Sequence, residues 1–108
     1  MEILTEGVHS GSASGVVPSS FRIIRELLDR VEDVTTGRVL LPEFHVGIPE
    51  DRRRQAERTA AVTEPYATTM PFVEGAVPMV ADPVEQLLAH TWRPVMSVVG
   101  ADGFPPTN

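Results

Sequence analysis

The residues of this sequence best suited to catalysis or metal binding are its three histidines, His9, His45 and His90. Zinc sites often show histidines two to four residues apart or a His-Glu-x-x-His pattern, and these histidines have neither arrangement. A catalytic zinc needs about three protein ligands and a water, which the scattered acids do not supply. The sequence has no cysteine, which also excludes thiolate zinc sites, thiol nucleophiles and disulfides. We therefore expect this chain to hold no metal site by itself.

A serine-rich segment, residues 10–15, follows His9 directly and invites comparison with nucleophilic enzymes. The nucleophile elbow of serine hydrolases has the pattern Gly-x-Ser-x-Gly, but residues 11–15 place Ala13 at the nucleophile position. A phosphate-binding loop would end in Gly-Lys-Ser/Thr, and the chain contains no lysine. We interpret the segment as a flexible loop.

His9 stands where an expected strand gives way to this loop, a place from which a side chain can project into a neighbouring cavity. Isolated histidines are nonetheless more often surface or satisfied core residues, and spacing alone favours that interpretation. His45 beside Phe44, and His90 at the end of a helix, need only structural explanations. For Trp92, a core plug is a better interpretation than a ligand platform.

Charge and hydropathy exclude several kinds of partner. The formal charge is −6, and acids flank the only dense basic cluster, residues 52–54. Such a chain repels a phosphate backbone, so we expect no nucleic-acid partner and interpret the cluster as a solvated helix face. No apolar run approaches the roughly 20 residues that span a bilayer, and the first residues do not resemble a secretory signal. We expect no membrane association and a cytoplasmic location.

The clearest predicted element is a helix that begins after Pro18-Ser19-Ser20. Its apolar residues recur at spacings of three and four: Phe21, Ile24, Leu28 and Val31. Charged residues occupy the opposite face, so we expect the apolar face to pack on a sheet. The imperfect alternation of residues 2–9 predicts one strand of that sheet.

The middle of the chain is less regular. Residues 38–46 form either an edge strand or a loop, because Pro42 interrupts an apolar stretch. Residues 50–62 favour a short surface helix behind a proline, and residues 64–81 show no period.

The last part of the chain begins with a capping box, Asp82-Pro83-Val84-Glu85, in which the Glu85 side chain can reach back to the start of the helix. A short helix through His90 follows and stops at Pro94. Residues 95–99 predict a strand that leads into the glycine-containing turn at residues 100–103.

The predicted fold class is α+β, an antiparallel sheet with helices on one face. We expect one unit at most over residues 1–108, in which residues 64–81 form an irregular insertion. Two or three strands and one good amphipathic helix make a poor independent sheet, whose edges would pair with another chain. We therefore expect a piece of a longer protein.

The segment Val8-His9-Ser10-Gly11, followed by Gly15, Val16-Val17-Pro18 and an amphipathic helix, resembles a known lid, or dimerisation, domain. This domain belongs to the di-zinc peptidase family that includes carnosinase, acetylornithine deacetylase and glutamate carboxypeptidase. Similarity to its dipeptidase-like branch continues in Trp92-Arg93-Pro94 and in the turn at residues 100–103. The resemblance implies an incomplete ferredoxin-like lid, a single partial domain over residues 1–108 with an irregular insertion at about residues 38–91.

The sequence also departs from the family pattern. Ala13 stands where many members have an aromatic residue, and Ser14 stands where glycine is usual.

In this family the catalytic domain binds two zinc ions through histidines and acids that flank the lid in sequence. The resemblance therefore implies zinc in the full-length parent and none bound by this segment. The lid histidine reaches the active site of the partner subunit and helps to polarise the scissile carbonyl, a role implied here for His9 alone. A homodimer through the lid would place one His9 in each opposing site. The arginine that binds the substrate carboxylate in carnosinase-like members follows the turn, so Arg93 does not inherit that role.

The leading hypothesis is a lid segment of a zinc-dependent dipeptidase, carboxypeptidase or deacylase. With the catalytic domain of its parent, it would act in hydrolysis of an amide bond in a peptide or acyl-amino-acid substrate, and alone it would be inactive. The alternative is a free-standing, non-catalytic protein-interaction or dimerisation module.

Overall fold

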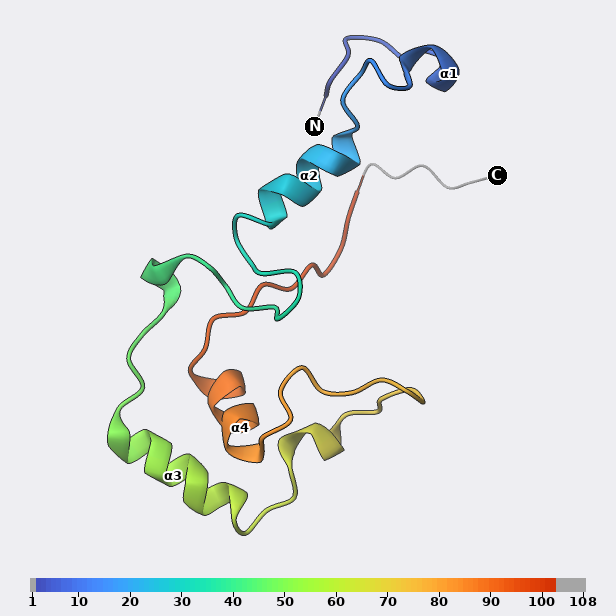
Figure 1. Cartoon of the computed structure of the whole chain (residues 1–108). Coiled ribbons are helices and arrows are strands. Elements are labelled where there is room, and N and C mark those ends of the chain that lie inside the picture. The colour runs from blue at the N-terminus through green and yellow to red at the C-terminus, as the bar shows by residue number, and fades with distance from the viewer. Residues whose placement is uncertain (1, 103–108) are drawn as a thin grey trace.

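The computed structural model describes residues 2–102, and in this range the chain forms helices joined by long irregular segments (Figure 1). The elements, in chain order, are α1 (Ser10–Ala13), α2 (Ser20–Leu28), η1 (Pro42–Phe44), α3 (Glu50–Ala60), η2 (Tyr66–Thr69) and α4 (Pro83–Thr91), where η marks a 3-10 helix. The described range contains no β-strand, and its single bridge joins Glu32 to Val39. None of its helices is long and apolar enough to cross a membrane.

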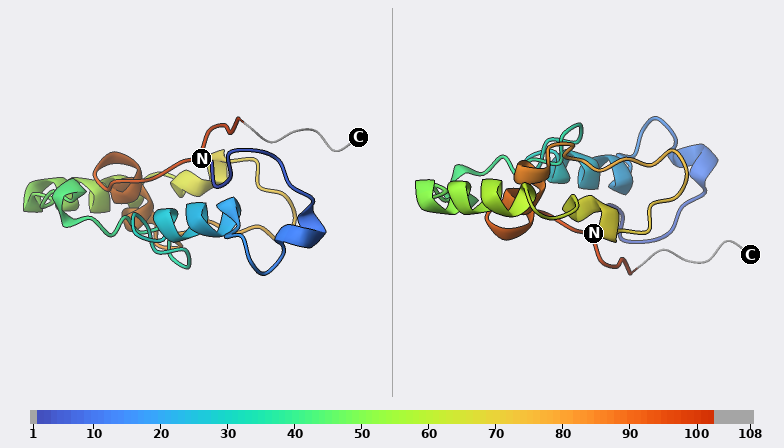
Figure 2. Two further views of the ribbon diagram at one scale, coloured as in Figure 1. Left: turned by 90° about the horizontal axis from the view of Figure 1, so that it is seen from above. Right: turned by 90° about the horizontal axis from the view of Figure 1, so that it is seen from below.

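The molecule is elongated and loosely packed. Its radius of gyration is 20.1 Å, whereas a compact chain of this length would have about 13 Å. The principal extents are 61 × 35 × 21 Å. Helix α3 lies at one end of the long axis and α1 at the other (Figure 2).

The predicted α+β fold, with the antiparallel sheet of an incomplete ferredoxin-like lid, is wrong, because no sheet forms in the described range. Residues 2–9 and 95–99, both predicted as strands, have no ladder partner. A strand is stable only when its backbone groups pair, and at least three strands or a packed helix are needed to support a sheet. Of the two alternatives for residues 38–46, the loop is correct: only Val39 forms a bridge, and η1 interrupts the rest.

The segment predicted as a flexible loop begins instead with the one-turn helix α1. Local side chains hold this turn, since its Ser-Gly-Ser-Ala sequence has little helix propensity of its own. At its start, the His9 side chain accepts the backbone N–H of Gly11, and at its end Ser14 Oγ donates to the Ser10 carbonyl at 2.7 Å. Gly15, with φ of 80°, then reverses the chain.

Helix α2 is confirmed where its apolar period predicts it, but the sheet that should cover it is missing. Phe21 is 59% exposed, Ile24 37% and Leu27 46%. Ile23 and Leu28 are only half-buried. The described chain therefore leaves the apolar face of α2 partly exposed to solvent.

Helices α3 and α4 are also confirmed, and they pack against each other at one end of the molecule (Figure 1). Asp82 caps α4 by accepting the Glu85 backbone N–H at 2.9 Å, as the capping box predicts. Leu88 of α4 is 1% exposed, and Ala56 of α3 is also buried. This contact forms a small core.

The irregular segment between α3 and α4 is fastened by one buried glutamine. Gln86 Oε1 accepts the backbone N–H of Ala67 at 2.9 Å, and its Nε2 donates to the Val80 carbonyl at 2.9 Å. Because Gln86 is 8% exposed, these bonds satisfy polar groups that would otherwise be costly to bury. The segment is therefore held over α4 although it contains only η2.

Candidate functional site

His9, the predicted catalytic residue, is an exposed residue at the N-terminal cap of α1. Its Nδ1 accepts a hydrogen bond from the backbone N–H of Gly11 at 3.1 Å. A nitrogen that accepts this bond carries no proton, so in the neutral ring the proton is on Nε2. No other hydrogen bond to this ring occurs within residues 2–102. His9 thus offers a free Nε2–H donor.

Gly11 controls the position of that ring. A Cβ atom at residue 11 would lie 3.0 Å from both Nδ1 and Cε1 of His9, which is tighter than an ordinary contact. Glycine lets the imidazole fold back over its own turn. The structure therefore gives the glycine of the His-Ser-Gly sequence a local steric reason.

The neighbouring serines do not form a nucleophilic pair with His9. Ser14 Oγ donates to the Ser10 carbonyl, and in the described part of the chain no serine hydroxyl bonds the imidazole. Activation of a serine requires a base within hydrogen-bond reach. The geometry gives no support to a serine hydrolase site here.

The other two histidines lie in separate surroundings. His45 Nε2 is 2.7 Å from the Val39 carbonyl and donates to it, which fixes η1 against the loop after α2. The ring of His90 stacks on Tyr66 with centroids 4.5 Å apart, and its Nε2 lies 3.3 Å from the Tyr66 hydroxyl. Both histidines have structural partners, and neither approaches His9 in a shared cluster.

No group of three or more histidine or acidic side chains in residues 2–102 could hold a metal ion. A catalytic zinc needs about three protein ligands, so these residues do not fit zinc.

Glu85 is the centre of the strongest charge cluster. Its Oε1 accepts from Arg53 of α3 at 2.9 Å, and its other oxygen pairs with Arg93 after α4. The hydrogen bond from Arg53, followed by the positive charge of Arg93, holds the pKa of Glu85 below its ordinary value. The predicted reach of Glu85 back to the start of its helix is wrong, because both oxygens bind arginines that lie outside α4.

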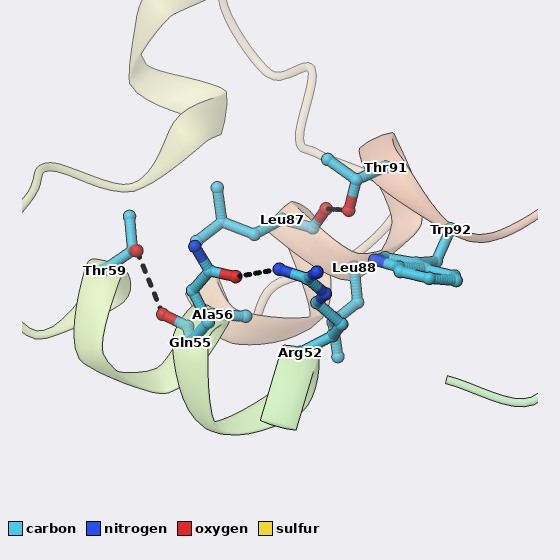
Figure 3. A pocket seen from close by; sticks show the side chains of 8 residues that line it. All are labelled: Arg52, Gln55, Ala56, Thr59, Leu87, Leu88, Thr91 and Trp92. Atoms are coloured by element: carbon cyan, nitrogen blue, oxygen red, sulfur yellow. Dashed lines mark hydrogen bonds between the residues drawn. The ribbon is translucent and has the colours of Figure 1, made fainter. Parts of the chain in front are cut away.

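A hollow of about 430 Å³ is lined by residues of α3 and of α4 and its C-terminal end (Figure 3). Leu88 and Ala56 contribute its apolar surface, and the Arg52 guanidinium is bonded to Gln55 at 3.0 Å. Trp92 is half-buried at one end of this hollow rather than plugging a core (Figure 3). The lining contains no acid, histidine or nucleophile pair that could carry catalysis.

Two polar residues organise this end of the molecule: sequence reasoning missed Gln86 and assigned Glu85 a different role. No motif marks Gln86, and its partners are backbone groups in a segment without a period. Glu85 pairs with Arg53 across 32 positions in sequence, so spacing within one helix could not reveal the contact.

No protein-family model and no curated protein matches this chain. The resemblance to the di-zinc peptidases is accordingly a prediction that depends on the His9 segment and the helix after it.

Proposed function

We propose that this chain is a lid segment of a zinc-dependent amide hydrolase of the dipeptidase, carboxypeptidase or deacylase type. In this proposal His9 polarises the scissile carbonyl, and the parent's catalytic domain, outside this chain, holds the zinc ions. The observation that carries it is the His9-Ser10-Gly11 turn, which leaves the Nε2–H of His9 free and exposed.

The chemistry of His9 suits an electrophilic helper rather than a base. Its Nδ1 is occupied by Gly11, so the ring can donate only through Nε2. A donor aimed at the oxyanion that develops during amide hydrolysis contributes about 3–4 kcal/mol to lowering the barrier in a dry site. His9 is exposed in this chain, so the water-excluding surfaces would come from the catalytic domain or a partner subunit.

The exposed face of α2 supports the same proposal. Ile24 and Leu27 form part of an apolar stripe that the described chain covers only in part. Such a stripe stabilises a protein only when another surface buries it. In this proposal, the remainder of the parent enzyme buries the stripe.

The experiment is a His9→Ala substitution in a full-length enzyme that contains this segment. We expect kcat to fall by about 10²–10³ with unchanged zinc content, since one oxyanion donor is lost and no ligand is removed. His45→Ala is the matched control, because His45 donates only to a backbone carbonyl. Unchanged turnover in His9→Ala would remove the assigned role.

A complementary measurement uses the isolated chain. We expect no hydrolysis of dipeptides or acyl-amino acids and no stoichiometric zinc, because its described residues form no metal site. Zinc-dependent turnover with bound metal would contradict the proposal that the catalytic groups lie elsewhere.

A second candidate is a free-standing module that associates through α2 without catalysis. The exposed Ile24 and Leu27 favour it as well. The surrounding reading frame separates the two candidates: ligand-bearing segments on both sides favour the enzyme, and their absence favours the module.

A further inference from the structure

A second hollow, of about 620 Å³, lies where the loop after α2 meets the segment after α4. These two segments cross near the middle of the molecule (Figure 1). Ligand pockets in proteins commonly have volumes of roughly 300–1,000 Å³. The hollow is therefore large enough for a small organic molecule, and it contains none of the residues proposed for catalysis.

Its polar lining is basic. Arg38, His45 and Arg93 line the hollow, and no aspartate or glutamate is among its described lining residues. The Arg38 side chain forms no hydrogen bond or ion pair with the rest of residues 2–102. Arg38 is therefore a cation available to a ligand.

Arg93 is only partly neutralised by its own partner. It shares the single carboxylate of Glu85 with Arg53, so one negative charge faces two guanidinium groups. His45 is fixed in the lining by its bond to the Val39 carbonyl. The hollow is thus lined by two guanidinium groups, and such groups suit one anionic group.

Asp33, in the loop that precedes Arg38, forms no ion pair with it. Asp33 Oδ1 accepts from the backbone N–H of Thr35 at 3.0 Å and from the backbone N–H and hydroxyl of Thr36 at 2.7 and 2.9 Å. These hydrogen bonds, led by that of the Thr36 backbone, lower the pKa of Asp33. Asp33 Oδ1 therefore stabilises the turn at residues 33–36.

The remaining walls are largely apolar and include Met79, Pro94 and Val95. Gly37 has φ of 68°, and a Cβ there would collide with the terminal methyl of Met79. Met79 therefore packs directly on the Gly37 backbone. Since methionine side chains are flexible, this wall can adjust to the shape of a bound apolar group.

We propose that this hollow binds a small monocarboxylate that has an apolar body. The carboxylate pairs with the free guanidinium of Arg38, which offers paired donors in the geometry that a carboxylate accepts. The apolar body lies against Met79 and Val95. The Arg93 charge, reduced by Glu85, favours a monoanion over a phosphate dianion.

The test is nuclear magnetic resonance titration of the whole chain with hexanoate, hexanamide, acetate and inorganic phosphate. Hexanoate should give saturable shifts of the backbone amide signals of Gly37 and Val95. Hexanamide lacks the negative charge of the carboxylate, and acetate lacks the apolar chain. Each should therefore bind about tenfold more weakly than hexanoate. Equal binding of hexanoate and hexanamide, tighter binding of phosphate, or shifts confined to α2 would each overturn the proposal.

Two arginine variants test whether the ligand carboxylate contacts Arg38. Arg38→Gln should weaken hexanoate binding by about tenfold or more. It should leave the fold intact, because the side chain has no partner within the described chain. Arg52→Gln is the matched control, since Arg52 lines the other hollow, and it should bind hexanoate as the unchanged chain does. Unaltered binding by Arg38→Gln would also overturn the proposed site.

Discussion

Helices α2 and α4 have the same length, nine residues, but opposite surroundings. The apolar pattern of α2 is the more regular, yet Leu27 on its apolar face is 46% exposed. Leu88 of α4 is 1% exposed, because α3 covers it and Gln86 holds the preceding segment against α4. An amphipathic pattern thus predicts a helix and its apolar face, whereas burial depends on whether another segment returns to that face.

The largest expected loss of stability follows a substitution in the buried face of α4. Leu88→Ala should destabilise the α3–α4 pair by about 2–5 kcal/mol, because it removes a fully buried side chain and leaves a cavity. Hydrogen exchange should accelerate in both helices. Leu27→Ala on α2 is the matched control and should leave α3 and α4 unchanged. Equal loss of protection in α2 and α4 after Leu88→Ala would show that the two regions are one cooperative unit.

The next effect concerns the segment that lies over α4. Gln86→Ala should cost about 1–3 kcal/mol, because the Ala67 N–H and the Val80 carbonyl lose a buried partner. Limited proteolysis should then cut faster between these two residues. Gln55→Ala removes an exposed glutamine from α3 and serves as the control. A Gln86→Ala chain that resists protease as before would disprove the fastening role.

A smaller effect should appear on acidification. The Arg53 hydrogen bond lowers the pKa of Glu85 from its ordinary value of 4.5. The unfolded chain therefore takes up this proton first, and the stabilisation by Glu85 is complete above pH 4.5 and lost as pH falls through the lower, folded value. Denaturant unfolding between pH 6 and 3 should show this loss in α3 and α4.

Glu85→Gln is the control for that pH dependence. It keeps the backbone N–H that Asp82 caps but removes the titrating carboxylate. The loss of stability below pH 4.5 should be weaker in this variant. An identical pH profile would assign the acid sensitivity to other carboxylates.

The smallest effect is expected at α2. Ile24→Ser should change the stability of the isolated chain by no more than about 0.5 kcal/mol, because this side chain is already partly in water. Circular dichroism during thermal unfolding measures the change. A cost comparable to that of Leu88→Ala would mean that the apolar face of α2 is covered in solution, for example by a second copy.

The helices could be predicted from sequence because their start signals are local. Pro18 and Ser19 precede α2, Pro49 precedes α3 and Asp82 caps α4. The sheet could not be predicted in the same way, because the alternation in residues 2–9 does not show whether a partner strand exists. The turn of α1 was missed because side chains, rather than helix propensity, hold it.

The two candidate sites differ in the same way, because one depends on adjacent residues and the other on residues far apart in the sequence. The exposed position of His9 beside Gly11 follows from a few adjacent residues, and its catalytic role stays a prediction. The hollow of Arg38 and Arg93 brings together residues from two distant segments, so no local pattern could indicate it.

Gln86 has a consequence for how this chain can vary. One side chain binds backbone groups of both Ala67 and Val80, so the two ends of the intervening segment meet at a fixed place on α4. Doubling the length of a closed loop costs only about 0.6 kcal/mol. Related proteins can therefore gain or lose residues between these two positions without displacing α4, provided that the glutamine is kept.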